Sequence, residues 1–345
     1  MQKNLLTWYA KHKRDLPWRS NPTPYAVLIS EVMAQQTRLG QLLPFYMRFM
    51  TQFPTIEALA ASTEDAVLAA WAGMGYYARA RNLHHTAREI CEKHGGVFPQ
   101  TRKEWEALSG IGAYTAGAIL AIAFGQKETA IDGNVLRLYA RLANDETDIS
   151  TTTAKHRAAE YVSAYMPHTS DKIRAFTQAL MELGALVCIP SNPRCESCPI
   201  SNFCEAYKAG NERNLPVKAR KKASPVIPLT VLRIFAPQGR VLMRKRTEGL
   251  LKGMWVYYLI EETPEKPSRT PAEITEYLAK TRGYTVTHIE PLGEARHTFT
   301  HRVWHMHGYD VHIKENYLIA DYHFISPDDM KNIALPAAMG YFIAK

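Results

Sequence analysis

Four cysteines stand close together in the second half of the sequence, at Cys188, Cys195, Cys198 and Cys204. Their spacing is C-x6-C-x2-C-x5-C, and thiolates this close together can hold a zinc ion or an iron–sulfur cluster. Zinc ribbons usually pair two C-x2-C knuckles, whereas this pattern has one, so the spacing alone does not choose the metal. The fifth cysteine, Cys91, lies alone in a helical stretch and is interpreted as a buried or inert thiol.

Two glycines flank Ile111 in the segment ALSGIGAYTAGAIL, residues 107–120. Gly110 and Gly112 permit a tight turn between two helices, with backbone amides exposed. The N–H groups and dipole at the start of the second helix make an anion site, and the missing side chains let a phosphate approach. The alternative is a plain helix–helix turn. Arg194, beside a cysteine, is a further candidate phosphate contact.

Glu31 and Asp132 are the carboxylates whose surroundings favour acid–base chemistry. Glu31 lies in an otherwise apolar helical stretch, where burial would favour its neutral, proton-donating form. Asp132 precedes the helical segment GNVLRLYARL, where an aspartate caps the helix and is held rigidly. The alternatives are a surface glutamate and a purely structural cap.

The elements that must position these residues are helical up to about residue 215. TPYAVLISEVMAQQTR (23–38) begins with a Thr23 cap and Pro24 at the first helical position, and its apolar residues share one face. IRAFTQALMELGALV (173–187) has the same periodicity. Both segments predict amphipathic helices.

The composition changes after residue 215. Residues 216–227 are rich in lysine, arginine and proline, which is typical of a basic linker. Beyond it, the sequence predicts a β-rich region that also contains a helix. Its predicted elements are a hairpin of LTVLRIF (229–235) and RVLMRKR (240–246), a strand GMWVYYLI (253–260), a helix TPAEITEYLAK (270–280) and a strand TFTHRVWHMHGYDVHI (298–313). We therefore predict a helical domain at 1–215, a linker at 216–227 and an α+β domain at 228–345.

The 345-residue chain carries a formal net charge of +9 and has a pI near 9.2, which favours a polyanionic partner. Its longest run of small apolar residues, 116–124, is too short to cross a bilayer. The N-terminal residues lack an apolar core followed by a cleavage site. We expect no membrane association and a cytoplasmic location, associated with the nucleoid in a bacterium.

The glycine turn, Asp132 in AIDGNVLR and the cysteine spacing together resemble the endonuclease III superfamily of DNA glycosylases. LPWR (16–19), SEVMAQQTR (30–38) and GYYARARNLH (75–84) are similar to the adenine DNA glycosylase (MutY) family. The resemblance covers nearly the whole chain. It implies a mainly α helix-hairpin-helix region that holds a 4Fe-4S cluster on the four cysteines of residues 188–204, followed by a Nudix-like domain. It also implies excision of adenine opposite 8-oxoguanine or guanine in duplex DNA, and we expect a monomer.

Bifunctional members of the superfamily carry a lysine where this chain has Tyr114, and a lysine amine can form an imine with the sugar. A phenol cannot, so Tyr114 implies a monofunctional enzyme that leaves an abasic site. By the resemblance, Glu31 protonates N7 of adenine and later handles the water, and Asp132 either stabilises the sugar cation or bonds to the sugar carbon. Asn134 is expected to position water or Asp132.

The resemblance also implies residues that handle the flipped base and the duplex. They are an adenine pocket of Arg14, Trp18, Arg19 and Gln178; DNA contacts at Gln36, Thr37, Met74, Tyr76, Gly110, Gly112 and Arg194; and an 8-oxoguanine loop of Phe299, Thr300 and His301. The sequence departs from the family at Ala34, Met74 and Thr177, where leucine, leucine and asparagine are usual. Met74 is apolar and flexible enough to keep an intercalating role.

The predicted helix of the C-terminal domain offers Glu273 and Glu276, without the Arg-Glu and Glu-Glu pairs by which Nudix hydrolases hold magnesium and diphosphate. We therefore predict no nucleotide hydrolysis. Four histidines, His297, His301, His305 and His307, are candidate zinc ligands or simply solvated side chains on a strand.

Two other functions compete with adenine excision. A bifunctional pyrimidine glycosylase is one, and both Tyr114 and the C-terminal domain count against it. A non-catalytic DNA-binding protein with a structural zinc is the other, and the absorption of an iron–sulfur cluster would exclude it.

Overall fold

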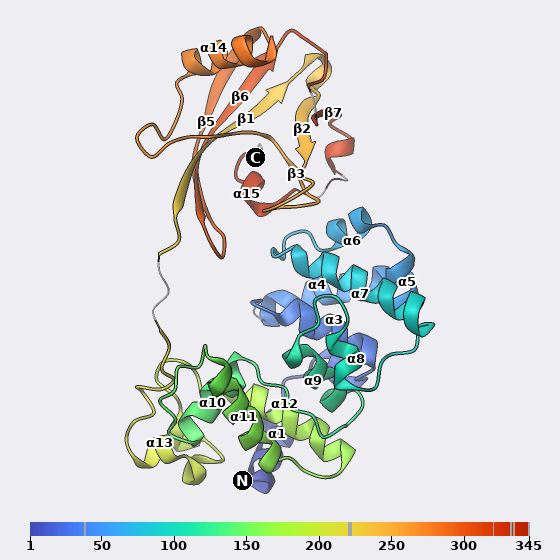
Figure 1. Ribbon diagram of the computed structural model, residues 1–345, viewed down its shortest axis with the longest axis vertical. Helices are drawn as coiled ribbons and strands as arrows, with labels where there is room; N and C mark the ends of the chain where they lie inside the picture. The colour runs from blue at the N-terminus through green and yellow to red at the C-terminus, as the bar shows by residue number, and fades with distance from the viewer. Residues whose placement is uncertain (38, 220–222, 320, 332, 334, 344–345) are drawn as a thin grey trace. The chain divides into compact units, whose positions relative to one another are not determined.

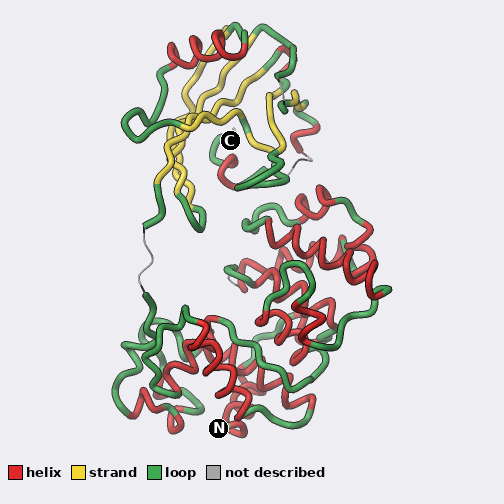
Figure 2. The backbone as a smooth tube through the Cα atoms, in the orientation of Figure 1, coloured by secondary structure: helices red, strands yellow, loops and turns green. Residues whose placement is uncertain are grey.

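The computed structural model describes residues 1–37, 39–219, 223–319, 321–331, 333 and 335–343 (Figure 1). Helices make up the regular structure of the described residues before 220, and a sheet dominates the described residues from 226 onward (Figure 2). The predicted fold class, a mainly α region followed by an α+β region, is confirmed. The chain divides into two compact units, residues 1–62 with 81–221 and residues 63–80 with 222–345. The domain boundaries at 215 and 228 stay a proposal.

The first region is a succession of helices joined by short loops. They are α1 (Gln2–His12), α2 (Pro17–Ser20), α3 (Pro24–Ala34), α4 (Leu39–Gln52), α5 (Ile56–Ala61), α6 (Glu64–Ala70), α7 (Ala78–His94), α8 (Arg102–Glu106), α9 (Ala113–Ile122), α10 (Gly133–Leu142), α11 (Thr152–Ala164), α12 (Ser170–Leu186) and α13 (Glu205–Lys208), with 3-10 turns η1 (Cys195–Ser197) and η2 (Ser201–Phe203). None of the helices in the described part of the chain is long and apolar enough to span a membrane.

Helix α3 begins as the sequence predicts. The Thr23 hydroxyl accepts a hydrogen bond from the amide of Ala26 at 3.1 Å, and Pro24 occupies the first turn, where no amide hydrogen is needed. Every residue from Tyr25 to Met33 is buried except Glu31, which keeps part of its surface accessible. The helix therefore holds one carboxyl group within an apolar packing face.

Helix α9 is made of small residues because it packs closely against its neighbours. It contacts α3, α8 and α12, and its residues from Thr115 to Ile122 are buried. A Cβ atom added at Gly117 would lie 2.0 Å from the carbonyl oxygen of Thr129, so only glycine fits there. This close packing brings Tyr114, in the first turn of α9, next to α3.

Helix α12 confirms the second predicted helix and packs against α1, α9 and α10. Phe176 and Leu183 are fully buried there, together with Leu5 of α1 and Ala121 of α9. The same cluster extends to Cys188 and Cys204, so the cysteine segment is packed against the helical core. Helices α3, α9, α10 and α12 together form the frame on which the predicted site residues lie.

The second region is built on a mixed sheet whose strand order is β3-β2-β1-β6-β5, with β4 paired to β1 and β7 paired to β2. Strands β1 and β6 are parallel, and the other pairs are antiparallel. The elements are β1 (Val226–Phe235), η3 (Pro237–Gly239), β2 (Val241–Lys245), β3 (Trp255–Val256), β4 (Tyr258–Glu261), α14 (Pro271–Arg282), β5 (Val286–Thr298), β6 (Val303–Ile313), β7 (His323–Ile325), η4 (Asp329–Lys331) and α15 (Ala337–Gly340).

The predicted β1–β2 hairpin and the predicted helix α14 are present, and α14 begins with a capping box between Thr270 and Glu273. The predicted strand 253–260 is instead two strands, because β3 pairs with β2 whereas β4 pairs with β1. The strand predicted from residue 298 starts at Val303, since residues 299–302 form the turn between β5 and β6.

Candidate active site

Glu31 and Tyr114 meet between helices α3 and α9. The Tyr114 hydroxyl donates a hydrogen bond to Oε2 of Glu31. Asp132, the residue before α10, is close enough for its charge to act on both groups. Three of the residues predicted to be catalytic are thus brought together by three different helices.

The environment of Glu31 favours a carboxyl group that holds its proton near neutral pH. Burial is the largest influence and raises the pKa of Glu31 to about 7; the negative charge of Asp132 acts in the same direction. The Tyr114 hydrogen bond and the Arg19 charge oppose this shift. Burial also raises the pKa of Tyr114 well above 10, so its phenol stays protonated and acts as a donor.

Asp132 is the N-cap of α10, as predicted. Its Oδ1 accepts from the Val135 amide at 2.7 Å, and its Oδ2 accepts from the side-chain amide of Asn134 at 2.8 Å. Burial raises the pKa of Asp132, while these hydrogen bonds and the Arg137 charge lower it. The carboxylate is therefore fixed in direction by its two donors.

Arg137 connects this site to the cysteine segment. Its guanidinium donates to Oδ1 of Asn134 at 2.9 Å, to the carbonyl of Gly184 at 2.7 Å and to the carbonyl of Cys188 at 2.8 Å. Because Asn134 in turn holds Asp132, a single buried arginine links the carboxylate to the first cysteine.

Glu182 is a site residue that sequence reasoning missed. It is fully buried on α12 and accepts hydrogen bonds from Arg14 at 2.7 and 2.8 Å and from Arg19 at 2.7 Å. Although burial acts in the opposite direction, the hydrogen bonds from Arg14 and Arg19 lower the pKa of Glu182 to about 2. The available signal was an acidic residue within the apolar segment 179–187 of the sequence, since a buried charge needs a partner.

The predicted adenine-pocket residues lie in different surroundings. Arg14 and Arg19 are both bound to Glu182, so they hold the 14–19 segment against α12. Trp18 is buried and lies edge-on to Tyr46, at 4.8 Å between ring centroids. Gln178 is half-buried on α12, and its amide donates to the carbonyl of Arg174. Their contact with adenine stays a prediction.

The glycine turn lies between α8 and α9, and its two glycines differ. Gly110 has φ +76°, and a Cβ atom there would meet the Asn82 side chain at 2.5 Å, so this position requires glycine. Gly112 has φ −101° and nothing within 4 Å of an added Cβ, so its backbone does not require glycine. The open space at Gly112 agrees with the room that a phosphate would need, and its contact with DNA stays a prediction. Open space in front of the first N–H groups of α9 suits an approaching anion.

The other predicted DNA contacts lie on two loops. Gln36 is exposed with φ +59° in the loop after α3, and Thr37 follows it, half-buried. Tyr76 is exposed, with φ +50°, and the Arg79 guanidinium lies 5.3 Å from its ring. Met74 is buried, so a role as an intercalating wedge would require it to move.

The predicted 8-oxoguanine loop is the tip of the β5–β6 hairpin. Thr300 and His301 are exposed there, and the Phe299 amide donates to the Arg302 carbonyl at 2.8 Å to close the turn. Phe299 is half-buried, with its ring 4.8 Å from that of Trp304 and 4.6 Å from that of His297. The hairpin tip thus exposes two polar side chains, Thr300 and His301, next to the packed rings of Phe299, Trp304 and His297.

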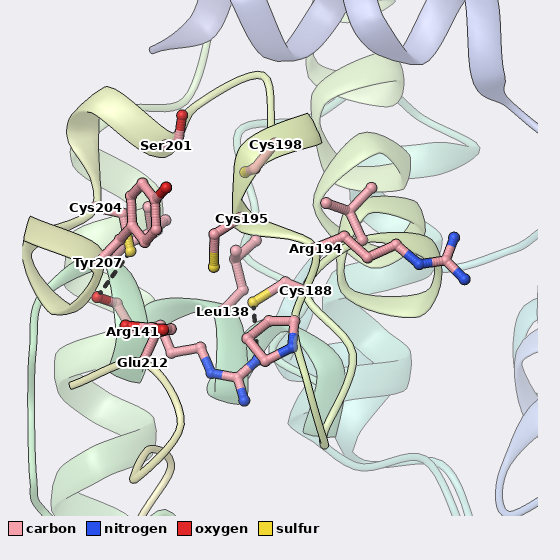
Figure 3. A pocket seen from close by; sticks show the side chains of 13 residues that line it. Leu138, Arg141, Cys188, Arg194, Cys195, Cys198, Ser201, Cys204, Tyr207 and Glu212 are labelled. Atoms are coloured by element: carbon pink, nitrogen blue, oxygen red, sulfur yellow. Dashed lines mark hydrogen bonds between the residues drawn. The ribbon is translucent and has the colours of Figure 1, made fainter. Parts of the chain in front are cut away.

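The four clustered cysteines line one cavity (Figure 3). None of the four is in a disulfide, and their sulfur atoms point into the same space, whereas the Arg194 side chain points away from it. Burial raises the pKa of Cys195, Cys198 and Cys204, that of Cys198 to about 12, so a thiolate here needs a cationic partner. Thiols with this arrangement suit a metal cluster.

Arg141 supplies fixed positive charge beside this cavity. It is almost fully buried and donates to Sγ of Cys188 at 3.3 Å, with further bonds to the carbonyls of Ile189, Pro190 and Leu215. The carbonyl of Arg141 accepts from Sγ of Cys204 at 3.2 Å. A buried arginine at a ring of thiols fits a net negative group in the cavity.

Known families match three parts of the chain. Residues 29–164 match the HhH-GPD superfamily of base excision DNA repair proteins, residues 188–204 the iron-sulfur binding domain of endonuclease III, and residues 230–345 the NUDIX domain. The adenine DNA glycosylases of Mus musculus and Homo sapiens are 32% and 31% identical to this chain, over 87% and 86% of its length. The matches span 68% and 64% of those two relatives, so the chain corresponds to about two thirds of their length.

This chain belongs to the adenine DNA glycosylase family. It is therefore a DNA glycosylase of base excision repair, it acts on DNA, and its cofactor is a 4Fe-4S cluster. Among solved structures, a thermostable thymine-DNA glycosylase has a TM-score of 0.55 and 29% identity, covering 60% of this chain and 95% of that one. A non-covalent endonuclease III–DNA complex, with a TM-score of 0.51 and 21% identity over 61% of this chain and 94% of that one, shows the same fold.

Proposed function

We propose that this glycosylase hydrolyses the bond between adenine and deoxyribose, where the adenine lies opposite 8-oxoguanine or guanine, and leaves an uncut strand with an abasic site. The observation that carries the proposal is the partly buried Glu31 carboxyl, which accepts a hydrogen bond from the Tyr114 phenol beside Asp132. This pair supplies a proton donor near neutral pH and offers no amine to the sugar.

Glu31 is the general acid in this proposal. With a pKa of about 7, a substantial fraction of the enzyme carries the proton at neutral pH. Transfer of that proton to N7 of adenine lets the bond between the base and the sugar carbon break, with its electron pair leaving on the base. The ionised Glu31 then accepts a proton from the water that adds to the sugar carbon.

Asp132 stabilises the positive charge that develops on the sugar as the base leaves. Its hydrogen bonds to Val135 and Asn134 fix the carboxylate before substrate arrives, so little reorganisation is needed. Asn134 acts as a positioning residue in this scheme, since its amide is already bound to Asp132.

Tyr114 supports an enzyme that excises the base without cleaving the strand. A strand-cleaving glycosylase needs an amine that attacks the sugar carbon and forms an imine, and a phenol cannot form one. Its hydroxyl is engaged with Glu31. Tyr114 therefore orients the acid, and water completes the reaction.

The β5–β6 tip is proposed to read the base opposite adenine. Thr300 and His301 offer exposed polar groups for the oxidised edge of the base. The family resemblance implies that Phe299 could intercalate into the duplex, which would require its ring to leave the contact with Trp304. Helix α14 of the same region supports no hydrolase role, since its Glu273 is already bound by Lys266 and by Thr270.

Cys188, Cys195, Cys198 and Cys204 are the proposed ligands of the cluster. When bound, the cluster joins four positions of the chain and so orders the loop that carries Arg194. Arg194 is exposed and is proposed to meet a DNA phosphate, as are the α9 amides after Gly112. We further propose a monomer that works in the cytoplasm with the DNA it repairs.

Single-turnover excision tests this function. Duplexes with adenine opposite 8-oxoguanine, adenine opposite guanine and an oxidised pyrimidine opposite guanine should be incubated with the enzyme, with and without alkali. We expect excision of adenine alone, strand breaks only after alkali, and a loss of at least ~10²-fold for Glu31→Gln with duplex binding retained. Excision of the pyrimidine, or nicking without alkali, would refute the proposal.

The reading of the opposite base has its own test. Thr300→Ala combined with His301→Ala should lower the excision rate opposite 8-oxoguanine more than opposite guanine, because the exposed tip would lose its polar contacts. Equal losses on both duplexes would assign the tip to general DNA binding instead.

A further inference from the structure

Three ligand-type side chains converge on the β5–β6 hairpin, away from the cysteine cavity. His305 and His307 alternate along β6, so they share one face of the sheet. Glu294 lies directly opposite His307 on β5. Of the four histidines considered from the sequence, His297 points instead toward Phe299, and His301 lies at the exposed tip.

The three side chains face one another at short range. Oε2 of Glu294 lies 3.2 Å from Nε2 of His305, and Oε1 of Glu294 lies 3.5 Å from Nδ1 of His307. The two imidazole rings are 5.0 Å apart, and the three residues offer one ligand atom each within 4.8 Å of the others. A small inward movement would bring these atoms to a common centre.

The surroundings leave room for a water ligand. Glu294 and His305 line a surface depression together with Val226, Ala295 and Arg296. Both histidines are half-buried, whereas Glu294 is exposed. Arg296 is paired with His305 across the ladder and is the neighbouring charge that opposes a cation.

We propose that Glu294, His305 and His307 form a binding site for a divalent transition ion, of which Zn²⁺ is the best fit. Two imidazoles and one carboxylate are a known zinc ligand set, and a water completes four-fold coordination. The hardness of Mg²⁺ and Ca²⁺ disfavours them here, since they prefer oxygen ligands. The ion would tie β5 to β6 a few residues before the hairpin tip.

Zinc content measures this site without any DNA, so its outcome is independent of the proposed substrate. The holoenzyme, with its cluster intact, should be equilibrated with ZnCl₂ by dialysis, and zinc and iron should be counted per chain. We expect the His305→Ala, His307→Ala double variant to bind zinc at least ~10-fold more weakly than the unchanged protein. His323→Ala, an exposed histidine on β7, is the matched control and should bind as the unchanged protein does.

Iron content reports whether a variant still folds. Equal zinc affinity in the double variant and the unchanged protein would overturn the proposal. Arg296→Glu keeps all three ligands and replaces the opposing charge with a carboxylate, so zinc affinity should rise about tenfold. If the histidine variants lose iron, the zinc affinity of Arg296→Glu tests the proposed site instead. An affinity for zinc that is unchanged or weaker in Arg296→Glu would reject the site.

Discussion

The phenol of Tyr114 donates a hydrogen bond to the carboxyl of Glu31, although 83 residues separate the two in the chain. The small residues of α9 make this contact possible, because they let the helix pack directly against α3. A hydrogen bond donated to a carboxyl group favours its ionised form, while burial favours the neutral form. The pKa of Glu31 thus reflects a balance that Tyr114 can alter.

Replacing Tyr114 by Phe should raise the pKa of Glu31 above about 7, because the hydrogen bond that stabilises the carboxylate is lost while burial remains. A bond to a charged group contributes about 1.5 kcal/mol or more, equivalent to about one pKa unit. The alkaline decline of the excision rate should therefore move about one pH unit upward in single-turnover profiles. A decline at the same pH as in the unchanged enzyme would show that Tyr114 does not control the acid.

Replacing Tyr114 by Lys places an amine beside Glu31 and Asp132, where a carboxylate can take up the proton that the ammonium must lose before it attacks the sugar. This variant should form a covalent complex with DNA that borohydride traps, and it should nick the strand without alkali. The unchanged enzyme should do neither at a comparable level. If the variant still excises adenine but traps no DNA, residue 114 does not face the sugar.

Two substitutions separate the two roles of Asp132. Asn at position 132 still caps α10 but lacks the charge, so excision should fall at least ~10²-fold with the melting temperature maintained. Ala removes the cap as well and should also lower the free energy of unfolding by about 1 kcal/mol. A near-normal rate with Asn would mean that the sugar cation does not depend on this carboxylate.

Replacing Cys198 by Ser should lower the iron content and weaken DNA binding together, because the loop that holds Arg194 depends on ligation. Cys91→Ser is the matched control, since Cys91 lies on α7, outside the cavity, and should leave both quantities unchanged. Full iron content in the Cys198 variant would show that the ligand assignment is wrong.

The parts of the fold that depend on local chemistry could be predicted from the sequence. Thr23 before Pro24, Asp132 before α10 and the cysteine spacing all act over a few residues, and each lies where the pattern places it. The division of residues 253–260 into two strands could not be predicted, because each half pairs with a different strand that is distant in the sequence.

Contacts between side chains that are distant in the chain could not be predicted from the sequence either. Nothing local to Glu182 names Arg14 and Arg19 as its partners, and nothing local to His307 names Glu294. Nor does the sequence distinguish the two glycines of the turn, since only Gly110 has a positive φ and Gly112 has an ordinary one. The partners of Glu182 and His307 are determined by which helices and strands pack side by side in the fold.

The pH dependence of single-turnover excision tests the central claim, that Glu31 donates a proton to the departing adenine. The rate on adenine opposite 8-oxoguanine should rise at acid pH as Asp132 ionises, above the ordinary aspartate pKa of 3.8 because burial raises it. It should then fall about tenfold per pH unit above about 7, as Glu31 loses its proton. The Glu31→Gln variant should lack this fall in its residual rate. A rate that stays constant from pH 6 to 9 in the unchanged enzyme, or an alkaline fall that persists in Glu31→Gln, would contradict the account.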